Sequence, residues 1–216
     1  MTKYAARDLV LKVGAHQFLS SIIATTDLFT ATAIHGLSAD DKVFVTSVGG
    51  GAAGLTLNKE YFVLATGLTT TAFKLSLTSG GAAIDVTSDM TGTGTFFKAL
   101  TVGQTNAIGP AGSARDLIDA SAYGDAFKDY VVGQQDGAEV ELTVTYDPAN
   151  ASHVLLKTLY DAGLPCDFLM THALATTFKV TFPALLTKLE RGGERDGLLA
   201  ANLTAKILNP GVTDAT

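Results

Sequence analysis

The first half of the chain contains the pattern G-x-G-x-x-G, formed by Gly49, Gly51 and Gly54. It follows the β-branched run Lys42–Thr46, as in folds where a strand delivers glycines to a dinucleotide pyrophosphate. Such a site also needs a helix directly after the glycines and an acidic residue about 20 positions further on. Here Tyr61–Ala65 is typical of a strand, and the first acid beyond that distance is Asp85. The pattern therefore indicates a turn between two strands.

Residues that could act as nucleophiles or metal ligands are present but are not grouped. The four histidines lie far apart and have no partner at metal-ligand spacing: His16, His35, His153 and His172. Cys166 is the single cysteine, and six residues along one expected strand would place it about 20 Å from His172. We therefore expect a buried structural thiol at Cys166 and a surface position for His153, at the start of a helix.

Five aspartates lie close together in the sequence before the longest alternating segment: Asp116, Asp119, Asp125, Asp129 and Asp136. They could hold calcium, but they lack the D-x-D-x-D-G order of a calcium loop, and a solvated acidic surface is the simpler interpretation. The sequence thus predicts no catalytic residue, no metal and no cofactor, and we expect that the protein is not an enzyme.

Composition excludes several classes of protein. With 216 residues, 47% of them hydrophobic, the chain can bury a substantial core. Its net charge of −6 argues against a basic clamp for nucleic acid, but is compatible with a surface that lets DNA pass without binding it. No apolar run is long enough to span a bilayer, and the N-terminus does not resemble a secretory signal. We expect a soluble protein with no membrane partner.

The clearest patterns lie in residues 99–216. Glu139–Tyr146 alternates strictly, with Val140, Leu142 and Val144 on one face, so it predicts a strand with one buried and one polar face. Residues 147–163 predict an amphipathic helix on that sheet, beginning at Asp147-Pro148 and ending at Gly163. Further strands are expected at Cys166–Met170, Thr176–Phe182, Leu185–Glu190 and Leu198–Leu208. In the second of these, Phe178, Val180 and Phe182 are expected to face inward.

Residues 27–98 have a different sequence pattern. Short β-type runs alternate with Gly, Thr and Ser turns at intervals of roughly 10 to 15 residues, which predicts a small all-β module. The sequence as a whole predicts a mainly β protein. It would comprise a discontinuous β-sandwich or barrel domain (residues 1–26 and 99–216) with one packed helix, and an inserted small β domain (residues 27–98).

The order of motifs in the discontinuous domain resembles the major tail tube proteins of long-tailed bacteriophages. The resemblance rests on Ile118-Asp-Ala-Ser121, on Gly133-Gln-Gln-Asp-Gly137, on the polar-faced strand that follows, and on the single helix and closing strands. Ala120-Ser121 departs from the Val-Thr usual in that family. The middle segment resembles a small β module of phage virion proteins, through Ile34-His-Gly-Leu37, Glu60-Tyr-Phe-Val63 and Gly80–Ile84. There Asp40-Asp41 replaces the usual Gly-Asp.

The resemblance implies a virion protein whose hexameric rings stack into a tail tube that conducts DNA during ejection. It implies tape measure, tail terminator and distal tail proteins as partners, and assembly in the host cytoplasm. We expect the lumen to be lined by Glu139, Glu141 and Thr143, with the polar faces of Thr177–Thr181 and Asn202–Lys206 as competitors. The loop Gly109–Gly137 is expected to contact a neighbouring subunit or ring through Asp119, Tyr123, Phe127 and Tyr130. The inserted module is expected to point outward.

The alternative hypothesis is a two-domain β protein that recognises a glycan or a host surface through the inserted module. It requires exposed aromatic side chains on that module. The candidates are Phe29, Tyr61, Phe62 and Phe96.

Overall fold

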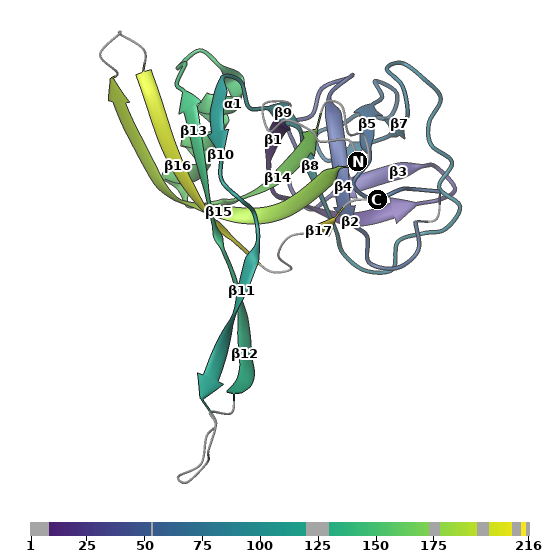
Figure 1. Cartoon of the computed structure of the whole chain (residues 1–216). Coiled ribbons are helices and arrows are strands. Elements are labelled where there is room, and N and C mark those ends of the chain that lie inside the picture. The colour runs from purple at the N-terminus through teal and green to yellow at the C-terminus, as the bar shows by residue number, and fades with distance from the viewer. Residues whose placement is uncertain are drawn as a thin grey trace, which may run out of the picture.

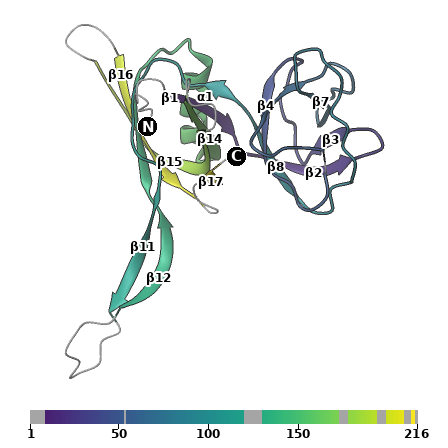
Figure 2. The ribbon, with the colours of Figure 1, turned by 45° about the vertical axis from the view of Figure 1, so that its right-hand side comes forward.

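The computed structural model describes residues 9–52, 54–119, 130–172, 178–193, 199–208 and 213–214. Within these ranges the chain forms two antiparallel sheets, a projecting hairpin and one helix (Figures 1 and 2). The predicted fold class, mainly β with one packed helix, is confirmed. We call the part built on the larger sheet the large unit (residues 9–15 and 99–214), and the part built on the smaller sheet the small unit (residues 17–98).

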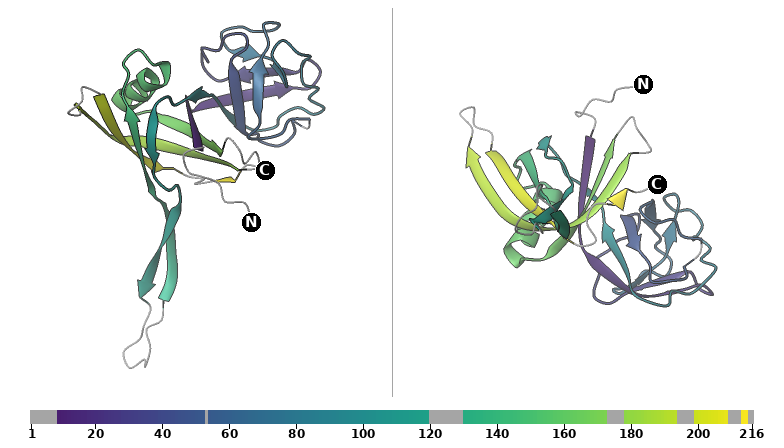
Figure 3. Two further views of the ribbon diagram at one scale, coloured as in Figure 1. Left: turned by 45° about the horizontal axis from the view of Figure 1, so that its top comes forward. Right: turned by 60° about the horizontal axis from the view of Figure 1, so that its bottom comes forward.

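The larger sheet bends strongly along its length (Figure 3). In spatial order it contains β10 (Thr105–Ile108), β13 (Glu139–Thr145), β16 (Leu199–Ile207), β15 (Lys179–Gly193), β14 (Pro165–His172), β1 (Leu9–Ala15) and β9 (Leu100–Thr101), while β17 (Thr213–Asp214) pairs with β15. The long strand β15 joins the two halves of the sheet, because its first part pairs with β14 and its second part with β16. The two strands predicted at Thr176–Phe182 and Leu185–Glu190 are thus one strand, with a register shift between Leu186 and Lys188.

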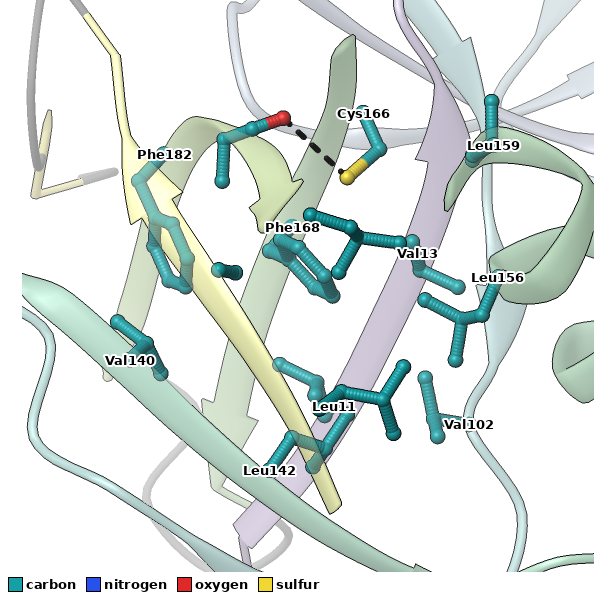
Figure 4. Packing of buried hydrophobic residues seen from close by; sticks show 14 of the residues in the cluster. Leu11, Val13, Val102, Val140, Leu142, Leu156, Leu159, Cys166, Phe168 and Phe182 are labelled. Carbon is teal, nitrogen blue, oxygen red and sulfur yellow. Dashed lines mark hydrogen bonds between the residues drawn. The ribbon is translucent and has the colours of Figure 1, made fainter. Parts of the chain in front are cut away.

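The bend of the sheet encloses the core of the large unit (Figure 4). Val140, Leu142 and Val144 lie in this core, which confirms the predicted alternation of β13. Val180 and Phe182 pack there as well, but Phe178 is 40% exposed, so the prediction that it faces inward is wrong. Phe178 lies before the start of β15, outside the alternating pattern of that strand.

The helix α1 (Ala151–Ala162) covers this core with Leu156 and Leu159. It begins later than predicted, because its N-cap is Asn150, whose side chain accepts a hydrogen bond from the Ser152 N–H. Asp147 instead accepts from the Ala149 N–H, in the turn before the helix. The predicted end is confirmed, since Gly163 adopts a left-handed conformation with φ of 61°.

The smaller sheet has its own core of buried apolar side chains. In spatial order it contains β6 (Ala72–Phe73), β3 (Leu28–Ala31), β2 (Gln17–Ile23), β8 (Gly94–Lys98), β4 (Lys42–Ser47), β5 (Glu60–Val63) and β7 (Leu75–Ser76). β2 belongs to this sheet, although residues 1–26 were expected to lie in the discontinuous domain. The change from one sheet to the other falls at His16, between β1 and β2.

The small unit is inserted between two strands of the large unit that pair with each other. β1 runs into the small unit and β9 leaves it, and these strands are antiparallel neighbours with Val13 opposite Leu100. The connection from β8 to β9 is Ala99 alone. The small unit therefore occupies the place of the turn in a β1–β9 hairpin.

A compact set of contacts joins the two units. Leu169 of β14 is fully buried against Phe44 and Phe97, whose rings stack 5.5 Å apart. Gly14 of β1 approaches β8 so closely that a Cβ there would lie 2.2 Å from the carbonyl oxygen of Lys98. Lys12 also reaches across, with its Nζ 2.5 Å from Glu60 Oε2. The small unit is thus docked against the outer face of β1 and β14, opposite the core of the large unit.

An ionic pair lies at the crossing between the units. His16 Nδ1 is 2.6 Å from Asp167 Oδ2, and the Asp167 side chain is 5% exposed. The hydrogen bond with Asp167 raises the pKa of His16. Burial raises the pKa of Asp167, although the hydrogen bond with His16 acts in the opposite direction. Both shifts have the same sign, so this pair binds more protons in the folded state than in the unfolded state.

We expect this pair to make the folded state less stable as the pH rises. The contribution of His16 is complete below its ordinary pKa of 6.5 and is lost as the pH rises through its raised value. Urea unfolding at about pH 5.5 and about pH 8.5 would measure the change, and Asp167→Asn and His16→Gln, singly and combined, would isolate it. The native chain should lose more stability over this interval than either variant. An equal loss in all the chains would contradict the assignment.

Candidate functional site

The glycine pattern does not form a nucleotide site. Among the described residues between β4 and β5 there is no helix, which confirms the interpretation of a turn. Gly51 and Gly54 have φ of 73° and 95°, and a Cβ on them would lie 1.8 Å from the Asp89 carbonyl oxygen and 2.2 Å from that of Asp85. These glycines are therefore needed for a left-handed backbone and for close packing of two loops.

The candidate nucleophile is part of the core. Cys166 is fully buried, as expected, and its Sγ donates to the Ala184 carbonyl oxygen at 3.4 Å (Figure 4). Burial raises the pKa of this thiol, which favours the unreactive protonated form. His172 lies at the other end of β14. Among the described residues there is no group of three histidine, cysteine or acidic side chains that could hold a metal ion.

The prediction that His153 lies on the surface is wrong, because this residue is 1% exposed. Its Nδ1 accepts a hydrogen bond from the Asp147 N–H at 3.0 Å, and its Nε2 donates to the Gly103 carbonyl oxygen at 2.9 Å. The ring also stacks on Tyr146. His153 therefore fastens the start of α1 to the turn before it and to the connection between β9 and β10.

The expected lumen residues lie on the face of β13 opposite the core. Glu139 and Glu141 are exposed and Thr143 is half-buried, while the residues between them are buried. On the neighbouring strand β16, Lys206, Thr204 and Asn202 stand directly opposite these three side chains. The Asn202–Lys206 segment, expected as a competitor, is thus part of the same polar face. The other segment considered for the lumen was Thr177–Thr181. There Thr181 is 6% exposed, and Thr177 lies outside the described residues.

The polar face continues onto the second part of β15. Lys188 pairs with Thr204, and Glu190 pairs with Asn202. We define the polar face as the exposed side of these three strands, formed by Glu139, Glu141, Thr143, Lys188, Glu190, Asn202, Thr204 and Lys206. The sequence did not single out Lys188 and Glu190, although their alternation in Leu185–Glu190 would have placed them on one side of a strand.

The segment expected as a loop is largely a hairpin that projects from the large unit (Figures 1 and 3). β11 (Ser113–Asp119) pairs with β12 (Tyr130–Gly137), and Asp119 stands opposite Tyr130 at its far end. Tyr130, Val131 and Val132 are 48%, 55% and 54% exposed. Tyr123 and Phe127 lie outside the described residues. The hairpin therefore exposes apolar side chains on β12.

Most of the four aromatic side chains that were candidates for glycan recognition are buried. Phe29, Tyr61 and Phe96 are buried in its core, at 0–1% exposure. Phe62 is half-buried, with Lys42 Nζ 5.4 Å from the centre of its ring. Three of the four candidates are thus core residues of the small unit.

A family model described as "Phage tail tube, TTP, lambda-like" matches residues 76–184, half of the chain. The chain belongs to this phage tail tube family. The match runs from the end of β7 through the hairpin and α1 into β15, so it includes β13 of the polar face. This lambda-like tail tube protein is accordingly a structural component of the phage tail, as the resemblance implied. Within the described residues, no helix has both the length and the apolar character needed to cross a membrane.

Among the solved structures that are similar to part of this chain, three match at low sequence identity. The tail of an empty GTA particle covers 55% of this chain and 87% of its own, with 11% identity and a TM-score of 0.46. The match to the SPP1 tail tube covers 52% of this chain and 66% of the SPP1 chain, with 11% identity and a TM-score of 0.45. The match to the baseplate of the anti-feeding prophage covers 54% of this chain and 83% of the baseplate chain, with 10% identity and a TM-score of 0.40. No curated protein matches the sequence.

Proposed function

We propose that this tail tube protein forms hexameric rings that stack into a tube, and that the polar face lines the channel through which DNA passes during ejection. One observation carries the assignment. Of the two halves of the bent sheet, the half formed by β13, β16 and the end of β15 has an exposed outer face, rich in carboxylates and hydroxyls. The outer face of the other half is covered by the small unit through Leu169.

The chemistry of the polar face suits a channel for DNA. Glu139 and Glu141 repel phosphates, and Thr143 and Thr204 add neutral groups that hydrogen bond to water. Thr143 Oγ1 already donates to Asn202 Oδ1 at 3.0 Å, so part of this polar surface is satisfied internally. A channel that held phosphates with unpaired cations would retain DNA through counterion release.

The hairpin and the small unit have separate roles in such a tube. The hairpin contacts a neighbouring subunit or the next ring, with Asp119, Tyr123, Phe127 and Tyr130 in or near the contact. Its exposed valines support this role, because apolar side chains on a projecting segment gain free energy when they are covered. The small unit points outward, and its docking on the outer face of the other half of the bent sheet, away from the polar face, supports this direction.

The proposed partners follow from the position of a tube in the tail. Further copies of the chain supply the ring and the stack. The tape measure protein would occupy the channel before ejection, and the tail terminator and distal tail proteins would close its two ends. DNA would pass through without specific binding, and assembly would take place in the host cytoplasm before the tail joins the virion.

Chemical labelling would test the position of the polar face. Because Cys166 is buried, Glu141→Cys introduces a single reactive thiol. We expect a bulky polyethylene glycol maleimide to modify this thiol fully in the free subunit, and at least about tenfold more slowly once tubes have formed, since a narrow channel excludes the polymer. A small maleimide should still reach it through the channel.

Lys157→Cys on the exposed side of α1 provides the matched control, because α1 lies on the other side of the core from the polar face. This thiol should react with the bulky reagent at similar rates before and after assembly. Equal protection at both positions would indicate a general effect of assembly. Unchanged reactivity of Glu141→Cys in tubes would place the polar face outside the channel and refute the proposal.

A further inference from the structure

We propose that Lys188 and Lys206, the two cations among the described residues of the polar face, are each held between two carboxylates, and that this arrangement prevents the face from binding DNA phosphates. The inference rests on the proposed function, because it concerns how the face lining the channel treats DNA. It adds a specific role for Asp136 and Glu190, which neither the sequence motifs nor the family match assigns.

Lys206 lies between the hairpin and the sheet. Its Nζ is 2.7 Å from Oδ2 of Asp136, which belongs to β12 near the base of the hairpin. Glu139 stands directly opposite Lys206 on the neighbouring strand. Side chains in that position have Cβ atoms about 5 Å apart, so the second carboxylate is also within interaction range.

Lys188 has a similar environment on β15. Its Nζ is 2.9 Å from Glu190 Oε1, two residues further along the same face of the strand. Glu141 lies in the same row across the sheet, because Glu141 pairs with Thr204 and Thr204 pairs with Lys188. The hydrogen bond and charge of Glu190, supplemented by the charge of Glu141, raise the pKa of Lys188. Both carboxylates thus act on this ammonium group.

The two lysines would otherwise form a phosphate-binding pair. Lys206 pairs with Leu185 and Lys188 with Thr204, so the lysines stand on adjacent strands in diagonally neighbouring positions. Such positions are about 7–8 Å apart, close to the spacing of successive phosphates along a DNA strand. Repeated in every subunit of a tube, the pair would present a continuous series of cations to DNA.

Stability does not account for these ion pairs. The paired side chains are all about one third exposed or more, and exposed ion pairs contribute little to the free energy of folding. Their clear consequence is electrostatic. Four carboxylates surround two ammonium groups, so the net charge of the cluster is negative and a phosphate must displace a carboxylate to reach either lysine.

The test compares three chains that differ only on the polar face. The first is the native chain. The second carries Asp136→Asn, Glu139→Gln, Glu141→Gln and Glu190→Gln, which removes the four carboxylates with little change of shape. The third adds Lys188→Gln and Lys206→Gln to these four changes and is the matched control. Tubes are assembled with a short fluorescent DNA duplex, treated with nuclease and washed, and the retained DNA is measured.

We expect the second chain to retain nuclease-protected DNA at about 50 mM salt, and the native and control chains to retain little. Two phosphate contacts steepen the log–log slope by about 2 for each subunit that the DNA touches, so binding should fall at least roughly tenfold between about 50 and about 200 mM salt. Equal retention by the second and third chains would overturn the proposal, because the lysines would then not be responsible. Equal retention by the native and second chains would also overturn it.

The same chains separate this inference from the proposed function. The second chain could bind DNA that the nuclease still digests. In that case the carboxylates do mask the lysines in the native chain, but the polar face lies outside the channel. As free subunits on a heparin column, the second chain should elute at higher salt than the other two, whether or not tubes form. Identical elution of all three would refute the masking.

Discussion

A chain carrying Val131→Asp and Val132→Asp is expected to fold and to remain as free subunits under conditions in which the native chain forms tubes. The two valines lie on β12 and are 55% and 54% exposed in the isolated subunit. Burial of the remaining exposed half of each side chain would contribute about 1 kcal/mol, so the loss of both raises the concentration needed for assembly at least tenfold, by this estimate. Burial of two unpaired carboxylates would raise it further.

Negative-stain microscopy and sedimentation of the assembled material would measure this effect. Because the valines are already half exposed, the thermal unfolding midpoint of the free subunit should change by no more than about 2 °C. Val154→Asp, on the exposed side of α1, is a matched control that adds a carboxylate at a similarly exposed valine. Normal tubes from the double variant would show that this part of the hairpin is not an assembly contact.

Replacement of residues 15–98 by Asn-Gly should leave a large unit that folds and assembles into thinner tubes. Val13 already stands opposite Leu100, so a two-residue turn would join Gly14 to Ala99 and close an ordinary β1–β9 hairpin. Leu169 would be exposed in this chain, because Phe44 and Phe97 are removed, and Leu169→Thr should therefore accompany the replacement. We expect the large unit to be less stable by about 2–3 kcal/mol, because the apolar contact between the units is lost.

Chemical denaturation would measure the stability of the shortened chain, and microscopy would measure the diameter of its tubes. The Leu169→Thr substitution in the full-length chain is the control for the loss of the contact alone. Folded subunits that fail to assemble would show that the small unit contributes to contacts within or between rings. That result would contradict its proposed outward position.

Strands with one buried face were predictable from the sequence, whereas the strands of the projecting hairpin were not. β13 alternates strictly because Val140, Leu142 and Val144 pack in the core while Glu139 and Glu141 do not. The hairpin gives no such signal, because successive residues of β12, Val131 and Val132, are both exposed and so show no alternation. The segment containing β11 and β12 therefore had the composition of a loop.

The remaining differences come from long-range contacts. Residues 1–26 were expected in the discontinuous domain, but β2 within them pairs with β8, more than 70 positions away, and no local pattern indicates that pairing. The prediction divided β15 at Pro183-Ala184, whereas both residues lie within the strand and pair with Asp167 and Cys166 of β14. His153 is buried because the backbone of Asp147 and of Gly103 satisfies both ring nitrogens, and the Gly103 partner lies 50 residues away.

The candidate site was predictable in part for the same reason. Glu139, Glu141 and Thr143 were found from the alternation of a single strand. Their neighbours Lys188, Glu190 and Asp136 come from β15 and β12, and only the sheet and hairpin bring them onto one surface.

The position of the small unit between β1 and β9 also has a consequence for the order of folding. While residues 17–98 are unfolded, β1 and β9 are separated by a long flexible loop, and their pairing carries the entropy cost of closing it. Folding of the small unit brings Ala15 and Ala99 together and removes that cost. The small unit is also synthesised before all but the first strand of the large unit. We therefore expect that destabilisation of the core of the small unit would slow formation of the large unit without altering a residue there.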